Sequence, residues 1–274
     1  MLKKIISVSI VLYKTPVDEL AKCVESLKRI SIPFDLFLVD NSPDPRLKDL
    51  ISLLPGAVYF HLPNNPGYGA AHNLAIEKGS AGGYLFHLVI NADVYFNEDV
   101  VAPMIRYMLD NESVGQVMPK VLNPDGSIQR LCKLVPTPAD LFLRRFSPTS
   151  IREKNNRNFE LHHSEYKKLM FVPYLSGCFM LLRHSCLRDV GKFDERFFMY
   201  PEDIDLTRRI AERYQTMFFP DVSVYHSHGG ASRKSFKMFA IHFVNLVRYF
   251  NKWGWFFDSR RDFLNKKTLA QFVS

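Results

Sequence analysis

The apolar positions of this chain form short runs separated by polar clusters, and the runs predict the strands of a buried sheet. Residues 5–13 are β-branched and nearly continuous, which is typical of a strand covered on both faces. Runs of similar character predict further strands at 34–39, 57–62, 84–90 and 216–225. Helical spacing of apolar residues predicts helices at 17–30, 47–54 and 70–78. This alternation predicts an α/β fold with a mainly parallel sheet that helices cover on both faces.

Polar residues cluster directly after four of the predicted strands. The clusters are Lys14-Thr15, Asp40-Asn41-Ser42, Asn64-Asn65 and Asn91-Ala92-Asp93. In open α/β sheets, the ligand-binding crevice lies beyond the carboxyl ends of the strands. We therefore expect the four clusters to converge on a single site at that edge of the sheet.

The composition forces no domain boundary, so we expect a single domain over residues 1–274. Within it, the pattern favours a nucleotide-binding half at about 1–125 and an acceptor half at about 126–235. A C-terminal amphipathic helical segment follows at about 236–274. The charged stretch at 147–168 is typical of a mobile loop or an insertion.

The composition narrows the class of partner and the compartment. Hydrophobic residues make up 47% of the chain, which supports a sizeable core and argues against disorder. The net charge of +8 favours a phosphate-bearing partner, namely a nucleotide, a nucleic acid or an anionic membrane surface. The four cysteines lack Cys-x-x-Cys spacing, and the first residues lack a clear signal peptide. We therefore expect reduced thiols, a cytoplasmic protein and no membrane-spanning helix.

The segment 193–206 places five carboxylates among large aromatic residues. A carboxylate beside apolar groups is a candidate general base, because partial desolvation tunes its proton affinity. The alternative is an ordinary helix start, since acids complement the helix dipole there. Pro201 would place Asp203 in the first helical turn. The angular spacing of a helix then predicts that Glu202 orients the site and that Asp205 binds Arg208 or Arg209.

Candidate cation ligands lie after two of the predicted strands. Asp93 either ligates a divalent cation that bridges a diphosphate or belongs to a turn. His226 or His228 could complete a mixed nitrogen and oxygen site with Asp93, consistent with Mn²⁺ or Mg²⁺; alternatively both are loop histidines. No Cys/His set has the spacing of a zinc finger, so a structural zinc site is not expected.

Two further patterns have a functional and a structural interpretation. Gly67-Tyr68-Gly69 lacks the third glycine of a dinucleotide fingerprint and does not follow the first strand, although its glycines suit close backbone approach. Residues 236–257 carry aromatic groups at helical spacing together with basic residues. This pattern fits a helix packed on the core, or a basic amphipathic helix lying on a membrane.

Taken together, the motifs resemble family 2 glycosyltransferases of the GT-A fold, in particular the bacterial rhamnosyltransferase-like branch that builds polysaccharides. The matching motifs occur in family order: Ser9-Ile10-Val11-Leu12-Tyr13, Val39-Asp40-Asn41-Ser42, the stretch from Asn64 to Asn73, Asn91-Ala92-Asp93-Val94, Ser176-Gly177-Cys178-Phe179-Met180, the acidic stretch from Phe193 to Arg208, and His226 with Gly229 and Ser232.

The resemblance implies an inverting sugar transfer from a nucleotide donor. Asp203 would be the catalytic base, Asp93 the metal-binding acid and His226 a second ligand of Mn²⁺ or Mg²⁺. The expected donor-binding residues are Thr15, Asp40, Asn41, Asn65, Gly67, Asn73, Asn91 and Asp93, with Asp40 paired to the pyrimidine base. Asn91 stands where a strict DxD motif has its first acid, which puts tight metal dependence in question.

The branch suggests dTDP-L-rhamnose as donor, with a UDP-hexose or a galactofuranose donor as the alternative. The acceptor would be a saccharide, lipid-linked at the inner face of the cell membrane, with a possible peripheral membrane contact. A sugar-nucleotide pyrophosphorylase would need a glycine-rich basic loop after the first strand, and Lys14-Thr15-Pro16 is not one. A nucleic-acid partner would be repelled by the acids at 194–205.

Overall fold

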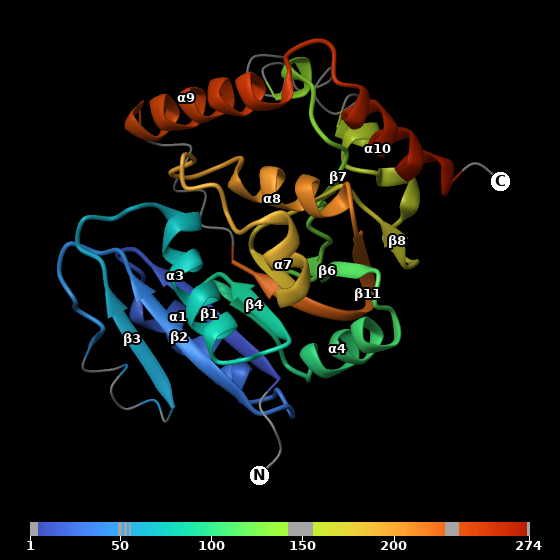
Figure 1. Cartoon of the computed structure of the whole chain (residues 1–274). Helices are drawn as coiled ribbons and strands as arrows, with labels where there is room; N and C mark the ends of the chain where they lie inside the picture. Colours follow the sequence, from blue (N-terminus) through green and yellow to red (C-terminus); the bar gives the residue numbers. More distant parts are fainter. Residues whose placement is uncertain are drawn as a thin grey trace.

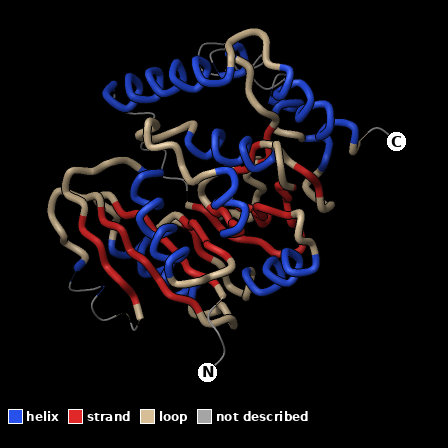
Figure 2. The backbone as a smooth tube through the Cα atoms, viewed as in Figure 1, coloured by secondary structure: helices blue, strands red, loops and turns tan. Residues whose placement is uncertain are grey.

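The computed structural model describes residues 5–48, 51, 54, 56–141, 156–227 and 236–272. A central sheet lies between helices (Figures 1 and 2). Its strands have the order β3 (Ala57–His61), β2 (Phe34–Asp40), β1 (Ile6–Leu12), β4 (Phe86–Ile90), β10 (Phe179–Arg183), β6 (Val114–Leu122), β11 (Gln215–His226) and β5 (Val94–Tyr95), and β8 (Met170–Phe171) pairs with β11 outside this path. Most of the pairing is parallel, as the sequence predicts. The fold is therefore of the expected α/β class.

The first half of the sheet follows the predicted alternation closely. Its strands are β1 (Ile6–Leu12), β2 (Phe34–Asp40), β3 (Ala57–His61) and β4 (Phe86–Ile90), all parallel. The helices that connect them include α1 (Val17–Leu27) and α3 (Tyr68–Ala81). The helix predicted at 47–54 falls partly on residues 49, 50, 52 and 53, which lie outside the described residues.

The second half contains an antiparallel strand that the sequence pattern did not reveal. The elements of this half are β5 (Val94–Tyr95), α4 (Val101–Asp110), β6 (Val114–Leu122), β7 (Cys132–Lys133), the 3-10 helix η1 (His162–Ser164), β8 (Met170–Phe171), β9 (Tyr174–Leu175), β10 (Phe179–Arg183), α7 (His184–Val190) and β11 (Gln215–His226). Strand β10 runs antiparallel to β4 and β6. It therefore begins where β4 ends, so the residues just before it, around Gly177, lie at the carboxyl edge of the sheet.

The two faces of the sheet are covered by different helices. Along β1, Ile6, Val8, Ile10 and Leu12 belong to the core that includes residues of α1 and α4. On the other face, Ser9 meets His72 of α3, and residues of α3, α7 and α8 (Glu202–Ala211) pack on β4 and β10. This alternation of facing residues is what a strand covered on both sides requires.

The C-terminal helices α9 (Phe236–Trp253) and α10 (Ser259–Ala270) lie at one end of the molecule, with α9 next to α8 (Figure 1). Tyr249 and Phe250 of α9 are buried against Phe197 and Ile204. The interpretation of a helix packed on the core is therefore confirmed for this face. Among the described residues, no helix has the length and apolar character needed to cross a membrane.

The described part of the charged stretch is packed into the protein. Phe159, Leu161 and Tyr166 are buried, and the Tyr166 hydroxyl lies 2.9 Å from the Glu160 carbonyl oxygen. The expectation of a mobile loop is therefore wrong for residues 156–168, because aromatic and aliphatic side chains among the charges anchor the segment. Residues 147–155 lie outside the described part of the chain.

Candidate active site

Tyr68, at the start of α3, links two groups of predicted site residues. Its hydroxyl lies 2.9 Å from Oδ1 of Asn91 and 2.8 Å from the carbonyl oxygen of Gly177. The Gly177 amide in turn donates to Oδ2 of Asp203 over 3.0 Å. The end of β4 and the first turn of α8, which are far apart in sequence, therefore meet in one hydrogen-bonded cluster at the carboxyl edge of the sheet.

Asp203 has the environment expected of a general base. Its two carboxyl oxygens accept from the backbone amides of Gly177 and Ile204, at 3.0 and 2.8 Å. Burial raises the pKa of the Asp203 carboxyl, while these amides and the charge of Lys133 oppose the rise. The residue as a whole is partly exposed. A carboxylate in this setting is a stronger base than one in water.

Glu202, the neighbour of Asp203, is more completely buried than Asp203. It is 5% exposed, and its Oε2 atom has no hydrogen-bond partner among the described residues. Burial, followed by the charge of Asp203, raises the pKa of Glu202 well above its usual range. Burial therefore disfavours the charged form of Glu202.

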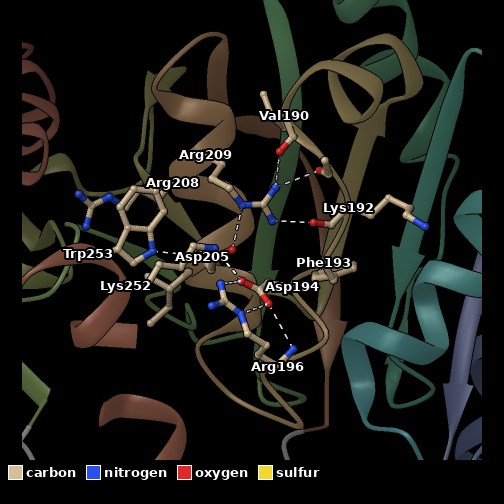
Figure 3. A network of polar contacts seen from close by, with 12 residues as sticks. Val190, Lys192, Phe193, Asp194, Arg196, Asp205, Arg208, Arg209, Lys252 and Trp253 are labelled. Atoms are coloured by element: carbon tan, nitrogen blue, oxygen red, sulfur yellow. Dashed lines mark hydrogen bonds and ion pairs between the residues drawn. The ribbon is translucent and has the colours of Figure 1, made fainter. Parts of the chain in front are cut away.

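Two other acids of the segment, Asp194 and Asp205, are paired with cations (Figure 3). Asp205 is fully buried and binds Arg209, Lys252 and Trp253 at 2.9, 2.6 and 2.8 Å. Hydrogen bonds from Arg196 and then Lys252 hold the pKa of the Asp194 carboxyl below its usual range. Such pairing weakens a carboxylate as a base, so the geometry favours Asp203 for that role.

The prediction that Asp205 binds one of the two following arginines is confirmed for Arg209. Arg209 also donates to the backbone carbonyl oxygens of residues 190–192, which fixes the chain just before the acidic segment (Figure 3). Arg208 instead forms a buried two-point ion pair with Asp258, at 2.6 and 2.7 Å. The two arginines therefore tie α8 to separate parts of the chain.

Helix α9 also holds the backbone of the acidic segment. Asn245 donates to the Met199 carbonyl oxygen over 2.9 Å, and Arg248 donates to the Arg196 carbonyl oxygen over 2.8 Å. Tyr200, whose φ of 64° is in the left-handed region, has its ring centroid 4.6 Å from that of His242. These contacts offset the cost of the uncommon backbone conformation directly before the helix that carries Asp203.

Asp93 and His226 lie together at the ends of two strands. Oδ1 of Asp93 is 3.3 Å from Nε2 of His226, and the Ser227 amide donates to the Asp93 carbonyl oxygen. Neighbouring ligand atoms of an octahedral cation lie about 3 Å apart, because each is about 2.1 Å from the ion. The spacing therefore fits two ligands of a single cation. Within the described residues, no group of three His, Cys, Asp or Glu side chains could hold a metal ion; His228 lies outside them.

A cavity of about 420 Å³ lies beside the ends of β1 and β2. Thr15 and Asp40 line it, together with Lys14, Ser42 and Arg46. The Asp40 carboxylate accepts from the Ser42 amide over 2.9 Å and from the Tyr59 hydroxyl over 2.8 Å. These two bonds fix the carboxylate at the wall of the cavity, where the sequence predicts contact with a base.

A buried contact between Asn41 and Gly67 connects the polar cluster at 40–42 to the turn that follows Asn64-Asn65. Asn41 is buried, its Nδ2 donates to the Gly67 carbonyl oxygen over 3.2 Å, and its Oδ1 has no partner among the described residues. Gly67 has a φ of 107°, and a Cβ there would collide with the Phe198 carbonyl oxygen. Only glycine suits this position, because the acidic segment passes directly over it.

Asn65 and Asn73 have different surroundings from each other. Asn65 is in the left-handed region, with a φ of 46°, in the turn before Gly67. Asn73 is buried, and its Nδ2 donates to the Phe193 carbonyl oxygen and to Glu195 over 2.9 and 2.8 Å. The structure thus places Asn73 under the acidic segment, where its amide holds the loop in position.

The sequence of the chain matches a known protein family. The model of the family described as "Glycosyl transferase family 2" matches residues 7–191. The chain belongs to glycosyl transferase family 2. The matched region contains the cavity beside Asp40, the Asp93 strand end and Gly177, whereas Asp203 and His226 lie beyond it.

Two curated relatives of this family 2 chain are rhamnosyltransferases. It is 28% identical over 208 residues to the N-acetylglucosaminyl-diphospho-decaprenol L-rhamnosyltransferase of Mycobacterium tuberculosis, a match that covers 71% of this chain and 66% of the relative. It is 24% identical over 248 residues to the rhamnosyltransferase WbbL of Escherichia coli, with 85% of this chain and 88% of the relative covered. The match thus spans just under two thirds of the mycobacterial protein.

Solved structures show that the family 2 chain has the GT-A fold. S. aureus TarS superposes with a TM-score of 0.58 at 16% identity, over 97% of this chain and 42% of that chain. The mannosyltransferase PcManGT from Pyrobaculum calidifontis, solved with GDP-Man and Mn²⁺, superposes with a TM-score of 0.57 at 16% identity, over 89% and 64% of the two chains. At this identity the likeness is one of fold.

Sequence reasoning missed two residues of the candidate site. Tyr68 connects Asn91 to Gly177, and its position between two glycines, opening a helix at a strand end, was a signal that could have singled it out. Gln129 contacts His226 at both its backbone and its ring. No local motif marks Gln129, because this contact joins residues 97 positions apart.

Proposed function

We propose that this protein is an inverting glycosyltransferase with Asp203 as its catalytic base. The observation that carries the proposal is the contrast within one acidic segment. Asp194 and Asp205 are bound by Arg and Lys side chains, whereas Asp203 is partly exposed, is bound by backbone amides and has a raised pKa. General-base chemistry needs one carboxylate with this character beside the donor site.

The donor would occupy the carboxyl edge of the sheet. Its nucleoside would enter the cavity beside Thr15 and Asp40, and its diphosphate would lie towards Asp93 and His226. These two side chains fit a divalent cation, Mn²⁺ or Mg²⁺, whose remaining ligands would come from the diphosphate and water. Such a cation neutralises negative charge on a departing diphosphate. The net charge of +8 also suits a phosphate-bearing donor.

The transfer step needs little beyond these groups. Asp203 accepts the proton of an acceptor hydroxyl as its oxygen bonds to the anomeric carbon of the donor sugar. The bond between that carbon and the diphosphate oxygen breaks at the opposite side, so the configuration inverts. Tyr68 and Gly177 hold Asp203 and Asn91 in fixed relation during the step. Burial of Glu202 disfavours a second negative charge beside the base.

The names of the relatives favour rhamnose as the transferred sugar, and we propose dTDP-L-rhamnose as its donor. A UDP-hexose or galactofuranose donor is the alternative. One relative is named for an acceptor linked to decaprenol through a diphosphate, so we further propose a lipid-linked saccharide acceptor at the inner face of the cell membrane. Phe256 and Phe257, 79% and 96% exposed after α9, are suited to a peripheral membrane contact.

A donor panel tests this proposal. dTDP-L-rhamnose, UDP-glucose, UDP-galactose and UDP-galactofuranose are incubated with the protein and Mn²⁺, and release of the nucleoside diphosphate is measured. We expect hydrolysis of one donor well above the others, and its loss in Asp203→Asn. Formation of a nucleoside triphosphate and a sugar 1-phosphate when pyrophosphate is added to the donor would indicate a pyrophosphorylase instead. No turnover or binding of any pyrimidine sugar nucleotide would contradict the proposal.

A further inference from the structure

A chain of hydrogen bonds between serine and histidine side chains runs through the core and ends beside Tyr68. Strand pairing places Ser7 of β1 next to His87 of β4, and the Ser7 Oγ atom lies 2.8 Å from Nδ1 of that ring. Ser9 Oγ lies 2.8 Å from Nε2 of His87 and 2.7 Å from Nδ1 of His72, on α3. These two serines and two histidines are fully buried. Because a hydroxyl and a neutral imidazole can each donate one hydrogen bond and accept one, the chain is satisfied without any charged group.

A third buried histidine, His184 of α7, lies against this chain. Its ring centroid is 5.8 Å from that of His87. The Nε2 atoms of His184 and of His72 have no hydrogen-bond partner among the described residues. Both nitrogens of a charged imidazole are donors, so a charged ring at either position would have an unpaired N–H group in the core. Such a group is costly to bury.

The groups around the three rings do little to offset this cost. Among the described residues, no carboxylate forms a hydrogen bond or an ion pair with any of the rings. The core residues of α3, β4, β10 and α7 that pack in this region are apolar. A cavity of about 340 Å³ beside His184 is lined by Glu77, Arg188 and Lys192, and Glu77 is paired with Lys192. The charge of Arg188 is positive and disfavours a charged His184.

The proton affinity of each ring reflects these surroundings. Burial lowers the pKa of His72 to about 3. Burial, followed by the charge of Arg188, lowers the pKa of His184 to about 4. Burial, followed by the neighbouring rings of His184 and His72, lowers the pKa of His87 well below its usual range. The fold therefore binds these three protons much more weakly than an unfolded chain does.

His72 connects this buried cluster to the candidate site through Tyr68. The two rings meet edge to face with their centroids 4.5 Å apart, and the Tyr68 hydroxyl contacts Asn91 and Gly177. We propose that His72, His87 and His184 make the packing of α3 and α7 on the sheet acid-sensitive, so that proton uptake loosens the support of Tyr68. Only the name given to the site beside Tyr68 rests on the proposed function, since stability and hydrogen exchange test this inference whatever the activity is.

The direction of the pH effect follows from linkage. The pKa of a histidine in an unfolded chain is about 6.5, and the pKa values of these three are lower in the fold. The stabilisation is therefore complete above about pH 6.5 and is lost as the pH falls from there towards the folded-state pKa values. Between pH 7.5 and 5.5, each of these histidines raises the unfolding equilibrium constant by about 10-fold, so the three together raise it by about 10³-fold.

The first test follows the ring signals of the nine histidines of the folded chain by NMR from pH 7.5 to 5.5. We expect three rings to keep the chemical shifts of neutral imidazole throughout, and the variants His72→Phe and His184→Leu each to lack one of these signals. Titration of all nine rings over this range would overturn the inference.

The second test measures urea unfolding by circular dichroism at pH 7.5 and 5.5. We expect the unfolding equilibrium constant in water to rise about 10³-fold in the wild type and about 10²-fold in His72→Phe or His184→Leu. His163→Leu is the matched control, because His163 is exposed, and it should keep the full 10³-fold rise. Any general damage by a substitution acts at both pH values and cancels in the ratio. A rise below about 10-fold in the wild type, or equal rises in all three variants, would overturn the inference.

Hydrogen exchange locates the effect within the fold. After correction for the intrinsic exchange rate, we expect the amides of α3 and α7 to lose more protection between pH 7.5 and 5.5 than those of α10, which is remote from the three rings in sequence. An equal loss in all three helices would mean that acid acts only through global unfolding, and would overturn the loosening of the support of Tyr68.

Discussion

Replacing Lys252 with Met removes a cation that two acidic residues share. The Nζ atom of Lys252 lies 2.6 Å from Asp205 and 2.8 Å from Asp194. Removing one partner of a fully buried ion pair costs about 3–5 kcal/mol. Asp205 would keep Arg209 and Trp253, and Lys252 is 22% exposed, so we expect about 2 kcal/mol. Met retains most of the apolar stem, which limits any loss of packing.

Urea unfolding followed by tryptophan fluorescence measures this loss. The chain has two tryptophans, Trp253 and Trp255, and both belong to the cluster beside Lys252, so the signal reports this region. With an m value of about 3 kcal/mol/M, a loss of about 2 kcal/mol lowers the midpoint by about 0.7 M. Lys167→Met is the matched control, because its ion pair with Glu165 is exposed and contributes little.

The loss should also depend on pH in a definite direction. The pKa of Asp194 is lower in the folded protein than its ordinary value, first because of Arg196 and then Lys252. Its stabilisation is therefore complete above the ordinary aspartate pKa of about 4 and is lost as the pH falls below it. The difference between wild type and Lys252→Met should narrow below about pH 4. A midpoint shift no larger than that of Lys167→Met, or one that widens in acid, would refute this reasoning.

Two further predictions concern the donor and the membrane. Asp93→Ala should weaken Mn²⁺-dependent binding of the donor nucleoside diphosphate by about 10-fold or more, because it removes one of the two candidate cation ligands, Asp93 and His226. Isothermal titration measures this binding. Unchanged affinity and an unchanged response to metal would make Asp93 a turn residue only. The double change Phe256→Ser and Phe257→Ser should lower co-sedimentation with anionic lipid vesicles, because these two side chains are the most exposed aromatic groups of the described residues; equal pull-down by anionic and neutral vesicles would contradict a membrane role.

The sequence was sufficient to predict most of the first half of the sheet. Residues 6–12 and 34–40 are strongly apolar, and the polar residues that each strand positions lie at its end or directly after it in the sequence. The strand ends therefore revealed Thr15, Asp40 and Asp93 as members of one edge. The antiparallel β10 was not predicted, because the apolar run at 179–183 carries no sign of direction. Direction depends on where the chain enters the sheet, which is a long-range property.

The acidic segment could likewise be predicted only in part from the sequence. Its composition indicated a site, and helix geometry separated Asp203 from Asp205. The cations that neutralise Asp194 and Asp205 include Lys252, which is 58 and 47 positions away, respectively, so no local pattern identifies it. The role of Asn73 under residues 193–195 and the contact of Gln129 with His226 depend on the same kind of distant pairing. Packing between remote segments decides which polar residues face a ligand and which hold the backbone.

The most direct test of the account is a comparison of Asp203→Asn with Asp194→Asn, each assayed for donor binding and for sugar transfer in a single preparation. Asparagine keeps the shape of Asp203 and removes its basicity. We predict that Asp203→Asn binds the donor normally and loses transfer by at least about 10²-fold, whereas Asp194→Asn retains most of its transfer activity. Near-normal transfer in Asp203→Asn, with collapse in Asp194→Asn, would contradict the assignment of the base and the mechanism built on it.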